Sequence, residues 1–234
     1  MSRRATVYLI PTFLDETGMD VLPAYLLQAI QATEVFFVEN ERSARRYLKK
    51  LWKEMNIDSY SWFTIHKSED SVIQEFIQQL KQGKQIGILS EAGCPGIADP
   101  GQILVATAQE ANALIKPLVG PNSIILALMA SGLNGQHFQF HGYLPIETAD
   151  RSKRIKELES FSRKDNSAQI FIETPYRNLS LLNSLLNNCQ NKTRLCIAVN
   201  LTGTTESIQT KPIEDWRTAI PDINKKPAIF IIQA

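Results

Sequence analysis

The sequence lacks the glycine-rich signatures of the commonest nucleotide-binding proteins. No Gly-x-x-x-x-Gly-Lys-Ser/Thr segment occurs, and no Gly-x-Gly-x-x-Gly follows the first apolar run. These segments hold phosphates in P-loop NTPases and in dinucleotide enzymes. Their absence argues against both classes.

Cysteine is scarce, and long apolar runs are missing. Cys94, Cys189 and Cys196 form no Cys-x-x-Cys pair, which argues against a disulfide framework and a structural zinc site. No run of about 18 apolar residues occurs, and the first residues lead into an expected strand rather than a signal peptide. We therefore expect a cytoplasmic protein with no membrane association and no bound metal.

Excess charge of either sign is also missing. The 234 residues carry 25 basic and 24 acidic side chains, for a net charge of +1. This balance excludes a globally basic nucleic-acid binder, so any RNA contact must be regional. The length suits two domains of roughly 115 residues each.

The first half alternates short apolar runs with amphipathic segments. This rhythm predicts a mainly parallel sheet covered by helices on both faces. Strands are expected at residues 5–10, 35–39, 62–66, 86–89 and 115–119, and helices at 20–31, 42–55, 71–81 and 103–113.

The second half has a different rhythm. Residues 138–143 alternate apolar and polar side chains, which is typical of a strand with one wetter face. Helices are expected at 124–130, 150–159 and 178–188, and strands at 169–173, 195–201, 206–210 and 228–233, giving a mixed sheet. The sequence thus predicts an α/β protein of two domains, 1–118 and 119–234.

A loop rich in glycine and proline, residues 90–101, follows the apolar run at 86–89. Such a loop specifies backbone geometry rather than side-chain bulk. It stands at the carboxyl end of an expected strand, where open α/β sheets bind their ligands. We interpret it as a cofactor loop.

This loop resembles the Ser-Asp-Ala-Gly-Thr-Pro-x-x-Ser-Asp-Pro-Gly signature of the tetrapyrrole methylase superfamily, with Glu91, Cys94 and Ala98 as departures. Further segments are similar to family blocks in the same order: 117–123 with 127–133, 138–145 with Arg151, and 172–177. The resemblance covers nearly the whole chain. It is closest to the branch of small-subunit ribosomal RNA cytidine 2′-O-methyltransferases.

The resemblance implies two α/β lobes with S-adenosylmethionine in the cleft between them, usually in a homodimer, and methylation of the ribose 2′-O of a cytidine in ribosomal RNA. Carried over by position, the cofactor-binding residues are Pro11, Ser90, Glu91, Ala92, Gly93, Ile97, Asn122, Ser123, Ile172, Asn200 and Leu201. Asn122 and Ser123 open an expected helix, whose free N–H groups can bind a carboxylate or a ribose oxygen.

Methyl transfer from a sulfonium needs an in-line approach and desolvation rather than a protein nucleophile. A ribose hydroxyl would still benefit from a base. Glu39, Glu91 and Glu173 stand at expected strand or loop ends, and helix capping or pairing with a nearby arginine is the structural alternative for each. We expect Glu173 and Arg177 to act near the methyl acceptor.

The expected helix at 42–55 carries a basic stripe at helical spacing. Its members are Arg42, Arg45, Arg46, Lys49, Lys50 and Lys53. The stripe predicts a local face for the RNA backbone, and a solvated face is the alternative interpretation.

One departure keeps other functions open. Where the family has Arg-Glu-Leu-Thr-Lys, residues 199–203 read Val-Asn-Leu-Thr-Gly, so two basic groups that could grip phosphate are missing. Methylation of a small molecule or tetrapyrrole, and a cofactor-binding paralogue without catalysis, are the two alternatives. A closed apolar cavity would favour the former, and a cleft blocked by Phe13 or Leu14 the latter.

Overall fold

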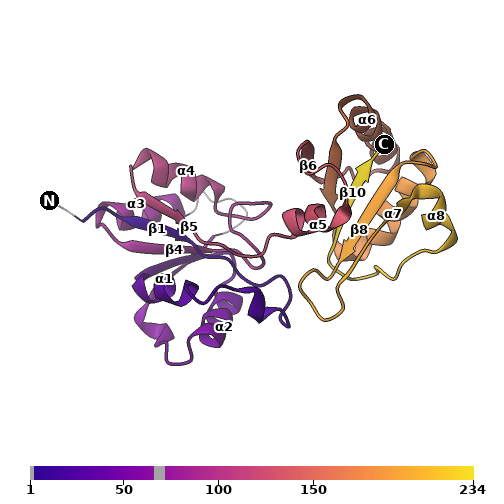
Figure 1. Cartoon of the computed structure of the whole chain (residues 1–234). Coiled ribbons are helices and arrows are strands. Elements are labelled where there is room, and N and C mark those ends of the chain that lie inside the picture. Colours follow the sequence, from indigo (N-terminus) through magenta and orange to yellow (C-terminus); the bar gives the residue numbers. More distant parts are fainter. Residues whose placement is uncertain (1–2, 66–71) are drawn as a thin grey trace. The chain divides into compact units, whose positions relative to one another are not determined.

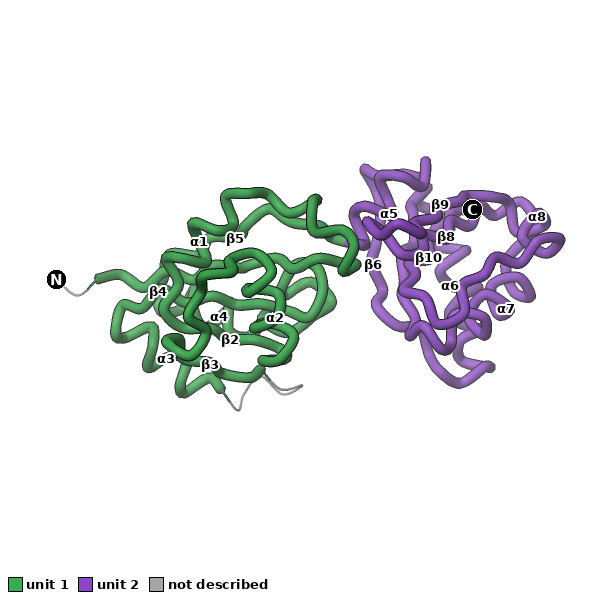
Figure 2. The backbone as a smooth tube through the Cα atoms, turned by 90° about the horizontal axis from the view of Figure 1, so that it is seen from below, with its two compact units in different colours: residues 1–122 green, residues 123–234 purple. Residues whose placement is uncertain are grey.

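The computed structural model describes residues 3–65 and 72–234. The chain forms two compact units, unit 1 up to Asn122 and unit 2 from Ser123 onward (Figure 2). The division expected after residue 118 and the observed one both lie between strand β5 (Leu114–Pro117) and helix α5 (Ser123–Ser131).

Unit 1 is built on a five-stranded sheet in the order β3-β2-β4-β1-β5, and the described pairings are all parallel. Besides β5, the strands are β1 (Thr6–Leu9), β2 (Val35–Val38), β3 (Ser61–Thr64) and β4 (Gln85–Leu89). Strands β2 and β4 are buried throughout, as their unbroken apolar runs predict for a sheet covered on both faces.

Helices cover both faces of this sheet (Figure 1). On one face α1 (Leu26–Ala32) and α2 (Glu41–Leu51) pack Leu26, Ile30 and Leu48 against the sheet. On the other, α3 (Ile73–Lys81) and α4 (Gln102–Glu110) contribute Phe76 and Leu104. The alternation in the sequence thus gives two apolar layers around one sheet.

The strand order places a switch point between β1 and its neighbour β4. The chain leaves β1 towards β2 through α1, and it leaves β4 towards β5 through α4 on the opposite face. Because the two connections run to opposite faces of the sheet, the loops after β1 and β4 separate and leave a crevice at the carboxyl ends of these two strands. One of those loops is residues 90–101.

Two helices of unit 1 depart most from their predicted bounds, while α4 ends at Glu110 instead of residue 113. The helix predicted at 20–31 begins only at Leu26, after a 3₁₀ turn at Met19–Val21, because Pro23 forces the preceding Leu22 into extended backbone. The helix predicted at 42–55 ends at Leu51, where Trp52 turns extended and packs against the core.

Two further predictions fall partly outside the described residues. The strand predicted at 62–66 is observed at Ser61–Thr64, and its last residue, His66, is not described. The helix predicted at 71–81 is observed from Ile73, and Ser71 is not described.

Unit 2 holds a mixed five-stranded sheet in the order β6-β7-β10-β8-β9. Strands β6 and β7 pair in parallel, and the remaining neighbours pair antiparallel. The strands are β6 (Phe138–Tyr143), β7 (Ala168–Ile172), β8 (Arg194–Val199), β9 (Ser207–Pro212) and β10 (Ala228–Gln233).

The core of unit 2 lies between this sheet and three helices, α6 (Thr148–Asp165), α7 (Asn178–Asn188) and α8 (Ile213–Thr218). Phe171, Leu181, Trp216 and Phe230 are buried there. Helix α5 contacts β8, β9 and β10 outside that cluster (Figure 1). Helix α8 was not predicted, and α6 extends past the predicted 150–159.

The strand predicted at 195–201 ends earlier, at Val199. Asn200 has a φ of 49° and Thr202 a φ of 68°, so the backbone leaves the extended region and turns. The expected cofactor residues Asn200 and Leu201 therefore lie in a loop. No helix in the described ranges 3–65 and 72–234 is both long enough and apolar enough to span a bilayer.

Gly120→Ala is expected to destabilise unit 1 by about 1–3 kcal/mol, because there is no room for a methyl group. A Cβ at Gly120 would lie 2.1 Å from Pro11 Cβ and 2.4 Å from Pro11 Cγ, on a rigid ring. Urea unfolding measures the change. Gly135→Ala is the control, since a Cβ there meets nothing within 4 Å. Equal stability of the two variants would contradict the tight packing.

Candidate functional site

The loop at 90–101 holds an unusual concentration of left-handed backbone. Gly93, Gly96 and Gly101 have φ values of 73°, 81° and 123°, and Ala98 has 61°. The N–H of Gly96 donates to the carbonyl of Pro100 at 3.1 Å, closing the loop on itself. The glycines are thus required by the backbone path, as the sequence predicts.

Hydrogen bonds join this loop to the ends of β1 and β5. The N–H of Thr12 donates to the carbonyl of Gly93 at 2.8 Å, and Tyr47 Oη donates to the carbonyl of Pro11 at 2.6 Å. Cys94 Sγ donates to the carbonyl of Pro121 at 3.4 Å. Burial raises the pKa of the Cys94 thiol, which suits this structural contact and not a nucleophile.

A cavity of about 330 Å³ opens beside the loop. It lies at the carboxyl ends of β1 and β5, next to the start of α4, and falls in the size range of small-molecule sites. Its walls are Leu9, Cys94, Pro95, Gly96, Ile97, Gln102, Val105, Pro117 and Leu118. Phe13 instead packs edge-on against Tyr47, with ring centroids 5.7 Å apart, so it does not fill this cavity.

The expected cofactor residues 11, 90–93 and 97 lie at the same edge of the sheet, and one of them lines this cavity. Ile97 forms part of its wall, with its side chain half-exposed. The start of the same loop is formed by Ser90, Glu91, Ala92 and Gly93. Pro11 lies next to this loop, because the N–H of the following residue, Thr12, donates to the carbonyl of Gly93, and Pro11 also packs closely against Gly120. Residues far apart in the sequence therefore share one edge of the sheet.

Carboxylates also gather here. Glu39 Oε2 accepts from the N–H of Glu91 at 2.9 Å, and Glu91 Oε1 accepts from Ser43 Oγ at 3.2 Å. Burial, followed by the charges of Glu39 and Glu91, raises the pKa of Asp99 to about 7, although a hydrogen bond from Ser90 acts in the opposite direction. Asp99 is not among the residues predicted from the sequence, although it occupies the second Asp position of the loop signature. A cationic ligand would relieve this repulsion.

Asp99→Asn is expected to stabilise the protein in a pH-dependent way. The folded-state pKa of Asp99, about 7, exceeds its ordinary value of 3.8, so its favourable contribution is lost as pH rises between those values. The gain in melting temperature should therefore grow from about pH 5 to pH 7 and then stay level. Calorimetry across this range checks it, with exposed Asp20→Asn as control. A constant difference would refute the raised pKa.

In unit 2, the expected cofactor residues stand at strand and helix ends. Ile172 closes β7 and lies opposite Ile229, while the N–H of Asn200 donates to the carbonyl of Pro227 at 3.0 Å. Both therefore flank the start of β10. Leu201 is buried beside Asn200. Ser123 is the first residue of α5, directly after Asn122, the last residue of unit 1.

The expected catalytic pair is in contact. Glu173 Oε1 accepts from Arg177 Nε at 3.0 Å, from Arg177 Nη2 at 2.7 Å and from the N–H of Thr174 at 2.6 Å. The hydrogen bond to Glu173 raises the pKa of Arg177. Glu173 Oε2 is buried and accepts no hydrogen bond from the described protein groups. The pair thus holds a fixed carboxylate, one oxygen of which is buried without a hydrogen-bond partner among the described protein groups.

Helix α2 carries five of the six residues of the predicted basic stripe. Lys53 lies beyond the helix, and several of the remaining charges are neutralised. Arg46 and Lys50 both contact Glu16, at 2.9 and 3.0 Å, and Arg45 contacts Glu41 at 2.7 Å and Asp58 at 3.3 Å. Three of the five stripe residues on the helix, Arg45, Arg46 and Lys50, are therefore paired with acidic residues, and RNA binding by the stripe stays a prediction.

Comparison with known proteins shows what this chain is similar to. No protein-family model matches it. It is 30% identical over 227 residues to the ribosomal RNA small subunit methyltransferase I of Vibrio cholerae, across 97% of this chain and 75% of the relative.

Two solved structures share its fold. The methyltransferase CobJ has a TM-score of 0.65 at 15% identity, covering 99% of this chain and 94% of that one. Uroporphyrin-III C-methyltransferase of Thermus thermophilus, complexed with S-adenyl homocysteine, has a TM-score of 0.57 at 11% identity, covering 98% and 97%. The expected two-lobed tetrapyrrole methylase fold is confirmed.

The sequence similarity extends through both units, including the loop at 90–101 and the Glu173–Arg177 segment. The solved structures show the fold. The V. cholerae relative shows the family as well, because it is 30% identical over 97% of this chain. The chain therefore belongs to the ribosomal RNA small subunit methyltransferase I family.

Proposed function

We propose that this protein transfers a methyl group from S-adenosylmethionine to the ribose 2′-O of a cytidine in small-subunit ribosomal RNA. The observation that carries the proposal is the 30% identity to a ribosomal RNA small subunit methyltransferase I along 97% of the chain. The cavity beside the loop at 90–101 supports it, because its wall includes Ile97, which the resemblance assigns to the cofactor.

The unit 1 residues fit this cofactor in size and charge. A cavity of about 330 Å³ can take an adenosine-sized group, and its apolar wall suits an adenine ring. S-adenosylmethionine carries a positive sulfonium and an ammonium group, which the carboxylates of Glu39, Glu91 and Asp99 would favour. When bound, the cofactor supplies an electrophilic methyl group.

The remaining contacts are assigned by position. In unit 1 we assign Pro11, residues 90–93, Ile97 and Asn122 to the cofactor. In unit 2 we assign Ser123, Ile172, Asn200 and Leu201.

Glu173 and Arg177 are proposed to serve the acceptor. Arg177 holds Oε1 of Glu173, which leaves the buried Oε2 to accept the proton of the ribose hydroxyl. The new C–O bond forms as the C–S bond of the cofactor breaks, and the proton passes to Glu173. Exposed Tyr143 and Tyr176, the latter next to Arg177 in sequence, could support a flanking base by stacking.

We also propose that the protein is a cytoplasmic homodimer without membrane association, as the family resemblance implies. Light scattering distinguishes a dimer from the 26.4 kDa monomer. A mass that stays at the monomer value across micromolar concentrations would reject the dimer.

A small tetrapyrrole is the second candidate substrate. The loss of basic residues at 199–203 and the fold shared with a uroporphyrin-III methyltransferase favour it. Labelled S-adenosylmethionine should be offered with small ribosomal subunits from a strain lacking the gene, and separately with a reduced uroporphyrin. Label in the RNA supports the proposal, whereas label in the tetrapyrrole alone would replace it.

A further inference from the structure

A second cavity lies entirely within unit 2. It encloses about 540 Å³ between the edge strand β6 and helix α6. Its walls are His137, Phe138, Gln139, Arg154, Phe161, Asp165, Ser167 and Gln169. Gln169 is the second residue of β7, whereas Ile172 is the last residue of this strand and Glu173 follows it. This groove is therefore separate from the residues assigned to cofactor and acceptor.

Two aromatic rings in the groove wall reach the surface. Phe138 is 39% exposed and Phe161 is 48% exposed. Phenylalanine is usually buried, so two exposed rings in one groove are informative. Every nucleobase offers a flat π-face, and stacking on an aromatic side chain contributes roughly 1–3 kcal/mol per base. The rings thus offer a platform that does not depend on base identity.

A guanidinium group is held in place beside these rings. Arg154 Nη2 donates to His141 Nδ1 at 3.3 Å, and His141 Nε2 contacts Gln169 Oε1 at 2.7 Å. Because arginine only donates, His141 Nδ1 must be unprotonated, so the ring is neutral with its proton on Nε2. Burial, together with the Arg154 charge, lowers the pKa of His141, which agrees with a neutral ring.

Arg154 also has donors to spare. It uses Nη1 for Glu157 at 3.3 Å and Nη2 for His141, and a third of its side chain remains exposed. A guanidinium fixed in this way can bind a phosphate through its remaining N–H groups. Asp165, in the same wall, offers a carboxylate that can accept from the amino group of a base.

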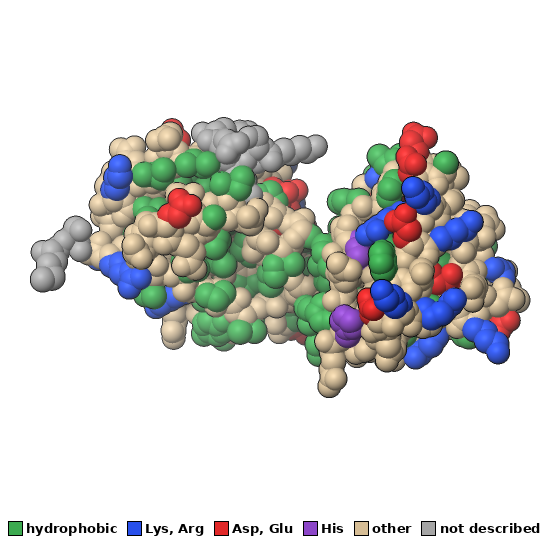
Figure 3. Space-filling model, turned by 90° about the horizontal axis from the view of Figure 1, so that it is seen from above, with side chains coloured by type: hydrophobic (Ala, Val, Ile, Leu, Met, Phe, Trp, Pro, Cys, Tyr) green, Lys and Arg blue, Asp and Glu red, His purple; other side chains and the backbone are tan. Residues whose placement is uncertain are grey.

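The surface around the groove carries a regional positive charge. Helix α6 presents Lys153, Arg154, Lys156, Arg163 and Lys164, and its one ion pair among the described residues is Arg154–Glu157. By helical spacing, Lys153 and Lys164 lie on the arc next to Phe161, while Lys156 and Arg163 lie further from it. Figure 3 shows Lys and Arg side chains gathered near histidine on this unit.

We propose that the groove between β6 and α6 binds one nucleotide of single-stranded RNA outside the methylation site. The base stacks on Phe138 and Phe161, and the phosphate contacts Arg154, with Lys153 and Lys164 along the backbone. This inference rests on the proposed RNA substrate. The groove would anchor the RNA while another nucleotide is methylated.

Phe161→Ala and Arg154→Ala test the groove. Binding of a fluorescent single-stranded octacytidylate, followed by anisotropy, should weaken about tenfold in Phe161→Ala. In Arg154→Ala the salt dependence should become shallower by about 0.7, as for one lost phosphate contact. S-adenosylmethionine affinity should match the unmodified protein, because neither residue lines the unit 1 cavity, and thermal unfolding shows that each variant is folded at the assay temperature.

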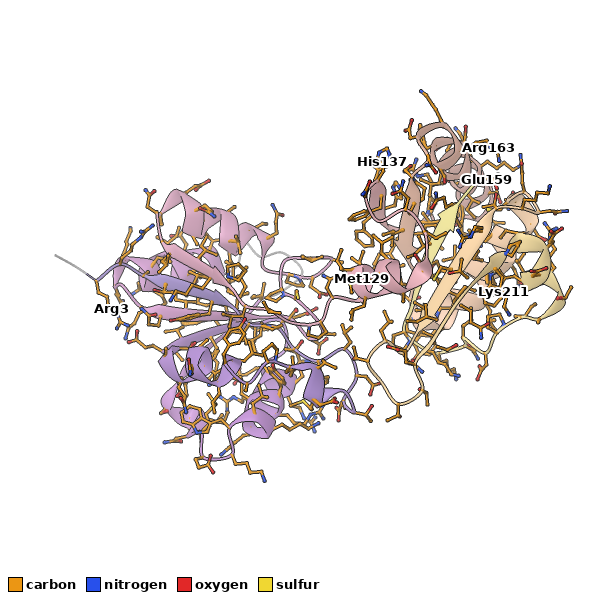
Figure 4. All side chains as sticks on the ribbon, viewed as in Figure 1. Arg3, Met129, His137, Glu159, Arg163 and Lys211 are labelled. Carbon is orange, nitrogen blue, oxygen red and sulfur yellow. The ribbon has the colours of Figure 1, made fainter. Side chains whose placement is uncertain are left out.

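Two variants serve as matched controls. Arg163→Ala removes one charge of α6 away from the groove, since Figure 4 shows Arg163 and His137 on either side of this helix. Ile220→Ala removes a similarly exposed apolar side chain outside the groove. Both should retain octacytidylate affinity within about twofold. Equal losses in test and control variants would overturn the proposal.

The outcomes separate this proposal from the proposed function. If the unmodified protein methylates small subunits while Phe161→Ala retains full octacytidylate affinity, the groove proposal fails alone. If the unmodified protein methylates no RNA, the proposed function fails, whatever the oligonucleotide result. A variant that loses affinity for intact subunits but not for octacytidylate would assign the groove to a ribosomal protein and overturn the RNA proposal.

Discussion

Gly93→Val is expected to abolish measurable binding of S-adenosylmethionine. Gly93 has a φ of 73°, which a β-branched residue rarely adopts, and a Cβ there would lie 3.2 Å from Leu14 Cδ2. Its carbonyl also accepts from the N–H of Thr12, so a shifted loop would separate from Pro11. Strain of this kind costs about 1–3 kcal/mol, before any clash with the cofactor is counted. Titration calorimetry measures the loss.

Ile97→Trp separates this effect from unfolding. Ile97 is 50% exposed in the cavity wall, so a larger ring should narrow the cavity without disturbing the core. Cofactor affinity should fall while the melting temperature stays constant. Ile220→Trp, at a site 56% exposed in unit 2, is the matched control. Normal affinity in both the Gly93 and the Ile97 variants would move the cofactor site elsewhere.

Glu173→Gln is expected to lower kcat for methyl transfer by about 10²–10⁴-fold, the usual contribution of a general base. The amide keeps the size of the side chain but cannot take the proton of the ribose hydroxyl at the position of Oε2. Cofactor affinity should change little. Single-turnover transfer to small ribosomal subunits, at saturating cofactor, measures the rate of the chemical step.

Glu159→Gln is the control for burying an amide in place of a carboxylate. Glu159 is also buried in unit 2, where its Oε1 accepts from the N–H of Gln190 at 2.7 Å and from Thr193 Oγ1 at 2.5 Å. This variant should lose stability without losing kcat. If Glu173→Gln behaves like Glu159→Gln, then Glu173 is a structural partner of Arg177 and not the base.

Much of the fold follows from periodicity in the sequence. The strand at 138–143, the helix at 178–188 and the final strand at 228–233 match the predicted bounds. Each has a clear apolar pattern and a distinct boundary, such as Pro175 before α7 and Pro227 before β10. The loop at 90–101 was predictable as a backbone-specified segment, because its glycines and prolines leave few other conformations.

The charged surfaces were less predictable, because they depend on contacts between distant residues. The stripe on α2 looked free in the sequence, yet Glu16 and Asp58 reach it through the fold. The more open basic surface lies on α6, whose charges have fewer acidic partners among the described residues. Helical spacing shows which charges share a face but not what packs against them.

The site itself was predictable in part. The sequence predicted Glu173 and Arg177 as functional residues, and the structure shows an ion pair between Arg177 Nη2 and Glu173 Oε1 at 2.7 Å. Asp99 was missed because its raised pKa arises from burial and from the charges of Glu39, which follows strand β2, and Glu91, which lies in the same loop.

The central claim is methylation of ribosomal RNA, and nucleoside mass spectrometry tests it most directly. Small subunits from a strain lacking the gene are incubated with the protein and deuterium-labelled S-adenosylmethionine, and their RNA is then digested to nucleosides. We expect labelled 2′-O-methylcytidine in small-subunit RNA with the unmodified protein and a strong decrease with Glu173→Gln. Label confined to another nucleoside, or no label from protein that binds the cofactor, would contradict it.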